Sequence, residues 1–202
     1  INLLIYFIRD SYGKISQMEL SELIKDAKLQ IDYMSQTIDD FRNFYKPSKE
    51  KKLFNIKESI IQSSKIVNAS LEKYGIKFEI FGEDLQLDSY ENEFEQVVVN
   101  ILNNAIDAKI VKSNSEKFDA RIEINIFKEN DNIVISIFNN CGNIDEQIIE
   151  RIFEPYFTTK FENQGTGIGL YMTKVIVEKN MNGKIQAKNL NDGVEFIIKL
   201  NA

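Results

Sequence analysis

Apolar residues recur along the first part of the chain at alternating intervals of four and three positions. The series comprises Leu20, Ile24, Ala27, Ile31, Met34, Ile38, Phe41 and Tyr45. This heptad spacing predicts a helix with one continuous apolar stripe. A shorter helical segment, residues 3–12, precedes it, with Gly13 in the turn. The two segments predict an antiparallel hairpin, whose stripe favours a dimeric four-helix bundle over packing within the chain.

Pro47 ends the helical pattern, and the charged stretch 47–52 marks a linker. Beyond the linker, helices are predicted over 56–74, over 91–111 and around Val175. Strands are predicted over 76–82, 120–140 (two strands joined at 129–132), 183–189 and 193–201. This order predicts an α+β fold, a two-layer α/β sandwich in which helices cover one face of a mostly antiparallel sheet.

The composition is that of a globular chain with a sizeable core. Of its 202 residues, 43% are hydrophobic and 28% are charged, which argues against a disordered chain. The net charge of −6 argues against nucleic acid as the main partner, because phosphate binding requires a basic face. Basic residues cluster only at 46–52, which we interpret as part of a solvated linker.

Rare and missing residue types narrow the possibilities further. The single cysteine, Cys141, can form no disulfide within the chain, which suits a reducing compartment. The longest apolar run, 3–8, is too short to span a bilayer, and no secretory signal follows Ile1. We therefore expect the sequence to be a piece of a longer protein. It contains no histidine, which excludes a histidine-based triad, a histidine metal site and a phosphohistidine within this chain.

Glycines concentrate at the start of one predicted helix, at Gly165, Gly167 and Gly169. Backbone N–H groups at a helix N-terminus attract anions, and glycines let phosphate oxygens approach the backbone closely. The segment matches neither the P-loop pattern nor a dinucleotide-binding fingerprint. By itself it predicts either a phosphate-binding loop or a glycine-rich turn without a ligand.

Two asparagines lie on the long helix predicted over 91–111. Asn100 and Asn104 are four positions apart, so they project from one face of that helix, one turn apart. The opposite side is apolar through Val97, Val98, Ile101, Leu102 and Ala105. Amide oxygens are hard, neutral ligands that suit Mg²⁺, whose other ligands are usually water and phosphate oxygens. The pair predicts either a magnesium site or two surface asparagines.

Four segments, in this order, resemble the motif boxes of the catalytic ATPase domain shared by sensor histidine kinases and the gyrase, Hsp90 and mismatch-repair ATPases. NILNNAIDA, residues 100–108, resembles the N box, and FEPYFTTK, 153–160, resembles the F box of the histidine-kinase branch. GTGIGL, 165–170, resembles one glycine box, and DGVEF, 192–196, resembles the final one. The resemblance implies a sandwich of the Bergerat type, which we place at residues 53–202.

The first part of the chain is also similar to a histidine-kinase element. Residues 1–46 resemble, in part, the dimerisation hairpin of that family, and residues 47–52 form the linker. The resemblance implies a homodimer through the hairpin. In the family the phosphoacceptor histidine lies on the first hairpin helix, and we expect this chain to begin just after it.

The resemblance implies that the chain binds ATP and Mg²⁺. Asn104 would bind Mg²⁺, and Asn100 would support the metal or the phosphates. Residues 153–166 would form a lid that Phe153 and Phe157 hold to the body and from which Lys160 reaches the phosphates. The implied catalytic residues are Asn100 and Lys160. The implied nucleotide-binding residues are Asn104, Asp107, Asn139, Gly142, Ile144, Phe153, Thr158, Thr159, Lys160, Gly165, Thr166, Gly167, Ile168, Gly169 and Leu170.

The segment that would bind adenine departs from the family pattern. It is NNCGNI, residues 139–144, where the family has Asp-x-Gly-x-Gly or a close variant. Asn139 stands where the adenine-binding aspartate is expected, Cys141 takes the position of a small residue, and Asn143 replaces a glycine. Asparagine tolerates positive φ better than most residues, so the turn is expected to survive.

The sequence thus predicts the catalytic core fragment of a bacterial two-component sensor histidine kinase in the cytoplasm. Its γ-phosphoryl transfer would run from ATP to a histidine outside this chain and then to an aspartate of a response regulator receiver domain, leaving ADP. One alternative is an ATP-hydrolysing clamp of the gyrase or Hsp90 kind, which uses a glutamate at the position of Asn100. Another is a non-enzymatic module whose altered 139–144 segment no longer takes nucleotide.

Overall fold

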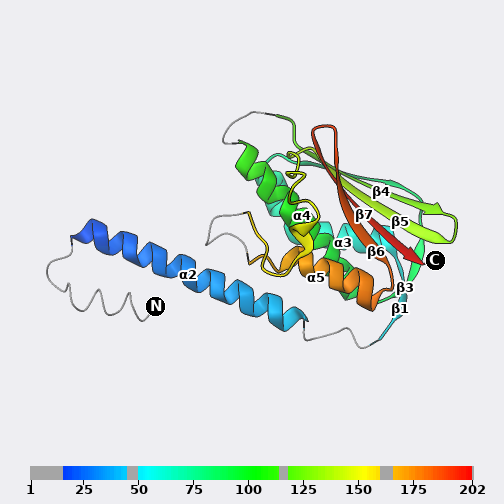
Figure 1. Cartoon of the computed structure of the whole chain (residues 1–202), viewed down its shortest axis with the longest axis horizontal. Coiled ribbons are helices and arrows are strands. Elements are labelled where there is room, and N and C mark those ends of the chain that lie inside the picture. The colour runs from blue at the N-terminus through cyan, green and yellow to red at the C-terminus, as the bar shows by residue number, and fades with distance from the viewer. Residues whose placement is uncertain (1–15, 45–49, 114–117, 160–165, 202) are drawn as a thin grey trace.

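The computed structural model describes residues 16–44, 50–113, 118–159 and 166–201. Figure 1 shows one long helix, α2, beside a compact part that contains the sheet and the other helices. The helical elements are α2 (Gln17–Phe44), α3 (Ile56–Lys73), α4 (Glu91–Ser113), α5 (Gly169–Val175), a 3₁₀ turn η1 (Arg151–Phe153) and a π-helical segment η2 (Ile176–Asn180). Among the residues that the structure describes, no helix is both long enough and apolar enough to cross a membrane.

Helix α2 confirms the predicted helix at its described positions. It begins with a capping box, in which Ser16 Oγ accepts a hydrogen bond from Glu19 N (3.2 Å) and the Glu19 carboxylate accepts one from Ser16 N (2.9 Å). Leu20, Ile24 and Ile31 are exposed along this helix. The predicted segment 3–12 lies outside the described residues.

The main sheet has five strands in the order β2-β4-β5-β7-β6, with β2 and β4 parallel and the other neighbours antiparallel. The strands are β2 (Lys77–Gly82), β4 (Arg121–Glu129), β5 (Asn132–Asn139), β6 (Lys184–Leu190) and β7 (Gly193–Asn201). The predicted hairpin at 129–132 is confirmed, because Glu129 pairs with Asn132 across a turn in which Asn130 has a φ of 55°. The α+β prediction is therefore confirmed.

A second, two-stranded sheet was not predicted. It pairs β1 (Lys52–Asn55) with β3 (Gln86–Ser89) in antiparallel fashion. Asn55 ends β1 and caps α3, because its side-chain oxygen accepts a hydrogen bond from Glu58 N at 3.0 Å. Four residues are the shortest run in which alternation can be recognised, and β1 does not alternate, since only Phe54 is buried in it.

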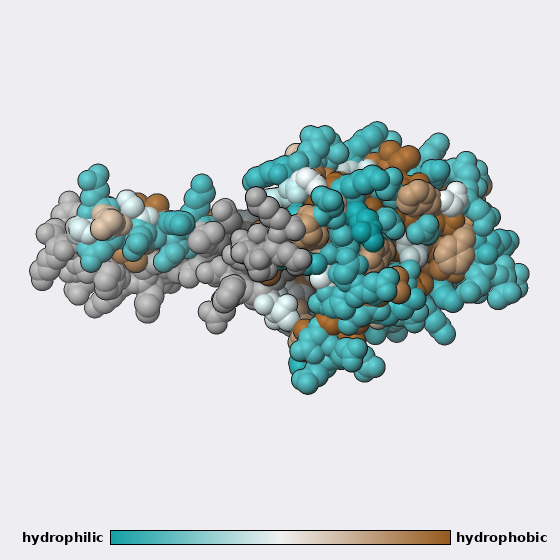
Figure 2. Space-filling model, turned by 90° about the horizontal axis from the view of Figure 1, so that it is seen from above, coloured by the Kyte–Doolittle hydropathy of each residue, from teal (hydrophilic) through white to brown (hydrophobic). Residues whose placement is uncertain are grey.

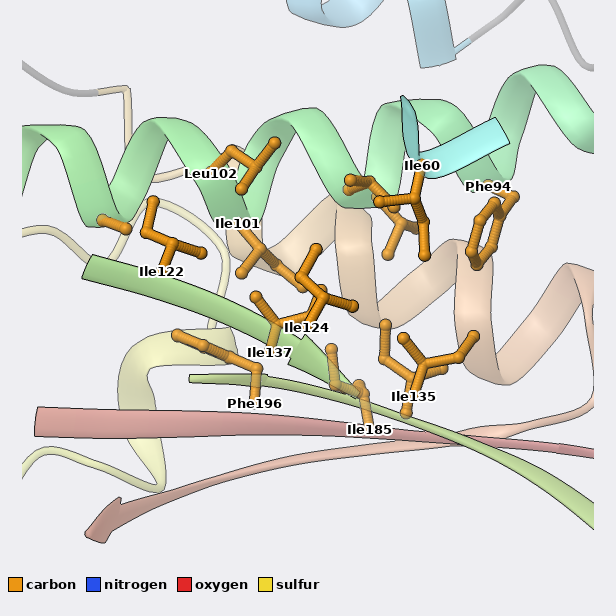
Figure 3. Close-up of a cluster of buried hydrophobic side chains, with 14 of the residues drawn as sticks. Ile60, Phe94, Ile101, Leu102, Ile122, Ile124, Ile135, Ile137, Ile185 and Phe196 are labelled. Carbon is orange, nitrogen blue, oxygen red and sulfur yellow. The ribbon is translucent and has the colours of Figure 1, made fainter. Parts of the chain in front are cut away.

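Helices α3 and α4 cover one face of the sheet, and the core lies between these two layers. Strands β4 and β5 contribute six buried isoleucines to it, Ile122, Ile124, Ile126, Ile133, Ile135 and Ile137. Figure 3 shows side chains of this core between α4 and the strands. On the face of the compact part that Figure 2 shows, most residues are hydrophilic and hydrophobic residues are scattered among them. The buried layer fixes which side of α4 faces away from the sheet.

Candidate functional site

Helix α4 separates an apolar side from a polar side, as predicted. Its buried residues include Val97, Val98, Ile101, Leu102 and Ala105. Asn100, Asn104 and Asp107 are half-buried on the same helix. The asparagine pair therefore belongs to a partly covered surface beside the core, and it is not a pair of fully solvated residues.

Both asparagines use their amide N–H groups as donors to the protein. Asn100 Nδ2 donates to the carbonyl oxygen of Gly169 at 3.1 Å and to Thr173 Oγ1 at 3.3 Å. Asn104 Nδ2 donates to the carbonyl oxygen of Asn100 at 2.9 Å. The side-chain oxygens are the atoms of the two amides whose chemistry suits a cation.

The glycine segment packs directly on the middle of the segment that resembles the F box. Gly167 has a φ of 65°, and a Cβ there would lie 2.5 Å from the backbone carbon of Tyr156. A side chain at this position would therefore collide with backbone, which requires glycine. Thr166 directly precedes this contact, and Ile168, Gly169 and Leu170 lead from it into α5. The predicted residues Lys160 and Gly165 lie outside the described residues.

Two aromatic residues tie the 153–159 segment to the body. Phe153 is buried and its ring meets that of Phe196 on β7 in a T-shaped arrangement with centroids 6.4 Å apart. Phe157 packs against the core cluster, and the Arg151 guanidinium lies 4.8 Å from its ring centroid. Thr158 and Thr159 follow as exposed residues. These contacts hold Phe153 and Phe157 against the body of the domain.

The 139–144 segment begins where β5 ends. Asn139 is only 1% exposed, and its side-chain oxygen accepts a hydrogen bond from Cys141 N at 3.1 Å. Strand β7 approaches this point so closely that a Cβ on Gly193 would lie 1.9 Å from the carbonyl oxygen of Asn139. The glycine of the final box is therefore required for β7 to lie against β5, the strand that ends at Asn139.

The turn itself depends on a different residue from the one expected. The positive φ, 118°, belongs to Gly142, and Asn143 is not among the described residues with positive φ. Asn143 replaces a family glycine at a position that does not have a positive φ. The position that has one, residue 142, is still a glycine. Asn143 adds a hydrogen bond from its Nδ2 to the carbonyl oxygen of Asn191 at 3.2 Å.

Asn189 is a residue of this site that the sequence did not reveal. Its side-chain oxygen accepts a hydrogen bond from Ile144 N at 2.9 Å, and its Nδ2 donates to the carbonyl oxygen of Ile144 at 2.7 Å. The pair of bonds fixes the end of the 139–144 segment to β6. The two residues are 45 positions apart, so no local pattern could have indicated the contact.

Helix α4 also reaches the 139–144 segment. Near its C-terminal end, Lys112 Nζ donates to the carbonyl oxygen of Asn140 at 3.3 Å. Burial raises the pKa of the Cys141 thiol to about 11, against an opposing effect of Lys109 and Lys112. Cys141 is therefore a neutral thiol near pH 7. One helix thus contacts the glycine segment through Asn100 and the 139–144 segment through Lys112.

The arrangement corresponds to a known family. The model for histidine kinase-, DNA gyrase B-, and HSP90-like ATPases matches residues 89–202. The two-component sensor PprA of Pseudomonas aeruginosa is 37% identical over 109 residues, which is 54% of this chain and 12% of that protein. The chain spans between 12% and 19% of the lengths of three curated sensor proteins.

Solved structures agree with this match. The catalytic domain of histidine kinase ThkA has a TM-score of 0.65 and 30% identity, covering 75% of this chain and 95% of that chain. A structure of ThkA in complex with response regulator protein TrrA has a TM-score of 0.72 and 25% identity, covering 98% of this chain and 56% of that chain.

Gly142→Ala is expected to lower the free energy of unfolding by about 1–3 kcal/mol, because a side chain is strained at the φ of this residue. The space is open, since an added Cβ would meet only Lys112 Cδ at 3.9 Å, so the loss measures backbone strain. Asn143→Ala is the matched control, with an expected change of about 0.5 kcal/mol. Urea denaturation measures both, and equal losses would contradict the assignment of the strain to Gly142.

Proposed function

Because the chain belongs to the histidine kinase-, DNA gyrase B-, and HSP90-like ATPase family and carries the catalytic ATP-binding domain of a histidine kinase, we propose that it is the catalytic part of a bacterial two-component sensor kinase. Its reaction moves the γ-phosphoryl of ATP to a histidine nitrogen, and ADP leaves. The observation that carries the proposal is the contact between Asn100 and Gly169, which joins the segments that resemble the N box and a glycine box.

The nucleotide lies, in this proposal, between the end of β5 and the start of α5. Asn139 faces the adenine, with Gly142 and Ile144 beside the base, and the backbone of 165–170 faces the phosphates. Phe153, Thr158, Thr159 and Lys160 belong to the lid. Each role comes from the family resemblance, and the contacts of α4 with both segments support a single continuous site.

The residues of α4 fit a magnesium ion. Asn104 and Asn100 would hold it through their side-chain oxygens, because both amide nitrogens donate to protein acceptors. Among the described residues, no group of three or more Asp, Glu, His or Cys side chains could hold a metal, so the phosphates and water would complete the shell. When bound, the ion neutralises charge on the phosphates during transfer.

The residue types of the site favour transfer over hydrolysis. An ATP-hydrolysing clamp needs a carboxylate to activate water where this chain has Asn100, and a carboxamide cannot accept that proton at neutral pH. The protein groups therefore bind and orient the nucleotide and exclude water around it. The acceptor histidine has to come from outside this chain, because its sequence contains no histidine.

A response regulator is the proposed partner for the second transfer. The support is the similarity to ThkA, a histidine kinase whose structure was solved in complex with the response regulator protein TrrA. The exchange of a phosphoryl group between ATP, a histidine and a receiver aspartate takes place where ATP is available, so we place the domain in the cytoplasm.

Helix α2 is the proposed dimerisation element. Its exposed Leu20, Ile24 and Ile31 fall in the heptad series, and water-exposed apolar stripes of this kind are covered in helix bundles. A second copy of the chain would present the same stripe.

Ile24→Glu is expected to convert a dimer into a monomer, because it places a charge in the middle of the apolar stripe. Lys25→Glu, a change at an exposed position of the same helix that does not flank the stripe, is the control and should leave the dimer intact. Sedimentation equilibrium measures both. A wild-type chain that stays monomeric up to high concentration would remove the dimer proposal.

Incubation with Mg-ATP is expected to leave this chain without acid-labile phosphate, while a separately supplied helical hairpin with a phosphoacceptor histidine becomes labelled. The same hairpin with its histidine replaced by glutamine is the control. Radiolabelled ATP and acid or base treatment distinguish the products. A chain that binds ATP yet labels neither hairpin above background would contradict the kinase function.

Asn139→Asp is expected to tighten ATP binding several-fold without tightening GTP. A carboxylate accepts a stronger, charge-assisted hydrogen bond from the adenine amino group, and the difference is about 1 kcal/mol. Asn140→Asp is the matched control, since Asn140 uses its amide to bind Arg121 N and the Asp119 carbonyl. Calorimetric titrations test this, and an unchanged ATP affinity in folded Asn139→Asp would show that Asn139 does not contact the base.

A further inference from the structure

Thr173 is a completely buried polar residue on α5 to which the sequence analysis assigned no role. It lies one helical turn after Gly169, and its hydroxyl donates a hydrogen bond to the Gly169 carbonyl oxygen at 3.0 Å. The same hydroxyl oxygen accepts a hydrogen bond from Asn100 Nδ2 at 3.3 Å. Thr173 therefore connects the backbone at the start of α5 with the asparagine on α4.

This connection fixes which way the Asn100 amide points. Asn100 Nδ2 faces two acceptors, the Gly169 carbonyl oxygen and Thr173 Oγ1. A reversed amide would bring its oxygen about as close to the Gly169 carbonyl, and two acceptors would then face each other without a proton between them. The Thr173 proton is already committed to Gly169, so the hydroxyl offers only a lone pair to Asn100.

We propose that Thr173 is a positioning residue that engages Asn100 Nδ2 and thereby leaves the Asn100 side-chain oxygen beside the start of α5, at the magnesium and phosphate end of the site. This oxygen lies 4.0 Å from the point that a Cβ on Gly169 would occupy. The inference rests on the function proposed above. According to the inference, the gain in nucleotide affinity that Mg²⁺ provides through α4 depends on a hydroxyl group of α5. The two helices are distant in sequence.

Two substitutions of Thr173 separate this role from ordinary packing. A valine has nearly the same shape and would fill the same buried space, but it offers no lone pair to Asn100 Nδ2. A serine would keep the hydroxyl and lose only the methyl group. Comparison of these two variants therefore separates the orientation of the amide from the filling of the core.

The experiment is a calorimetric titration of ADP and of a non-hydrolysable ATP analogue into each variant, with saturating Mg²⁺ and with EDTA. Thr173→Val is expected to reduce the Mg²⁺-dependent gain in affinity about three- to tenfold, the effect of one lost hydrogen bond. Its affinity in EDTA should stay within about twofold, and Thr173→Ser should retain the gain. Asn104→Ala removes a proposed ligand directly. Its loss of Mg²⁺-dependent affinity is the reference against which the loss in Thr173→Val is compared.

A double-mutant cycle tests whether Thr173 acts through Asn100. In an Asn100→Ala background, Thr173→Val is expected to change the Mg²⁺-dependent gain no further. The inference would be overturned if Thr173→Val weakened nucleotide binding equally with Mg²⁺ and with EDTA. It would also be overturned if the variant kept the full Mg²⁺-dependent gain in affinity. If the valine variant unfolds, Thr173→Ala takes its place against Thr173→Ser. A wild-type chain that binds no nucleotide would instead contradict the proposed function.

Discussion

Helix α4 has to bury Val97, Ile101 and Leu102 against the sheet, and this requirement fixes the rotation of the helix about its own axis. With that side inward, Asn100 meets the start of α5 and Lys112 meets the segment after β5. Rotation by one residue position, about 100°, would turn a core residue outward and remove both contacts. The hydrophobic core and the polar site are therefore two consequences of one helix orientation.

Close approaches of backbone to backbone complete the frame of the site. Gly193 lets β7 lie against the carbonyl of Asn139, and Gly167 lets the glycine segment lie against Tyr156. Asn189 then holds Ile144 by two hydrogen bonds. These contacts join segments from the middle and the end of the chain, so the proposed nucleotide site depends on the completed sheet and cannot form from α4 alone.

Periodicity predicted the long elements well, because α3, α4 and the strands β4 and β7 each bury a regular set of side chains. Strand β5 is instead buried at every position after its first. Periodicity did not reveal β1 and β3, which are four residues each. The positions of Asn100 and Asn139 were predictable from motif spacing, whereas Thr173 and Asn189 act through partners 73 and 45 positions away. Contacts of that kind arise from the fold and leave no local trace in the sequence.

The most direct test of this account is a crystal structure of the chain with Mg²⁺ and a non-hydrolysable ATP analogue. The account predicts adenine at Asn139 beyond the end of β5, phosphates beside the backbone of 165–170, and a metal ion within ligand distance of the side-chain oxygens of Asn104 and Asn100. A nucleotide bound elsewhere on the sheet, or a metal ion that contacts neither asparagine, would contradict it.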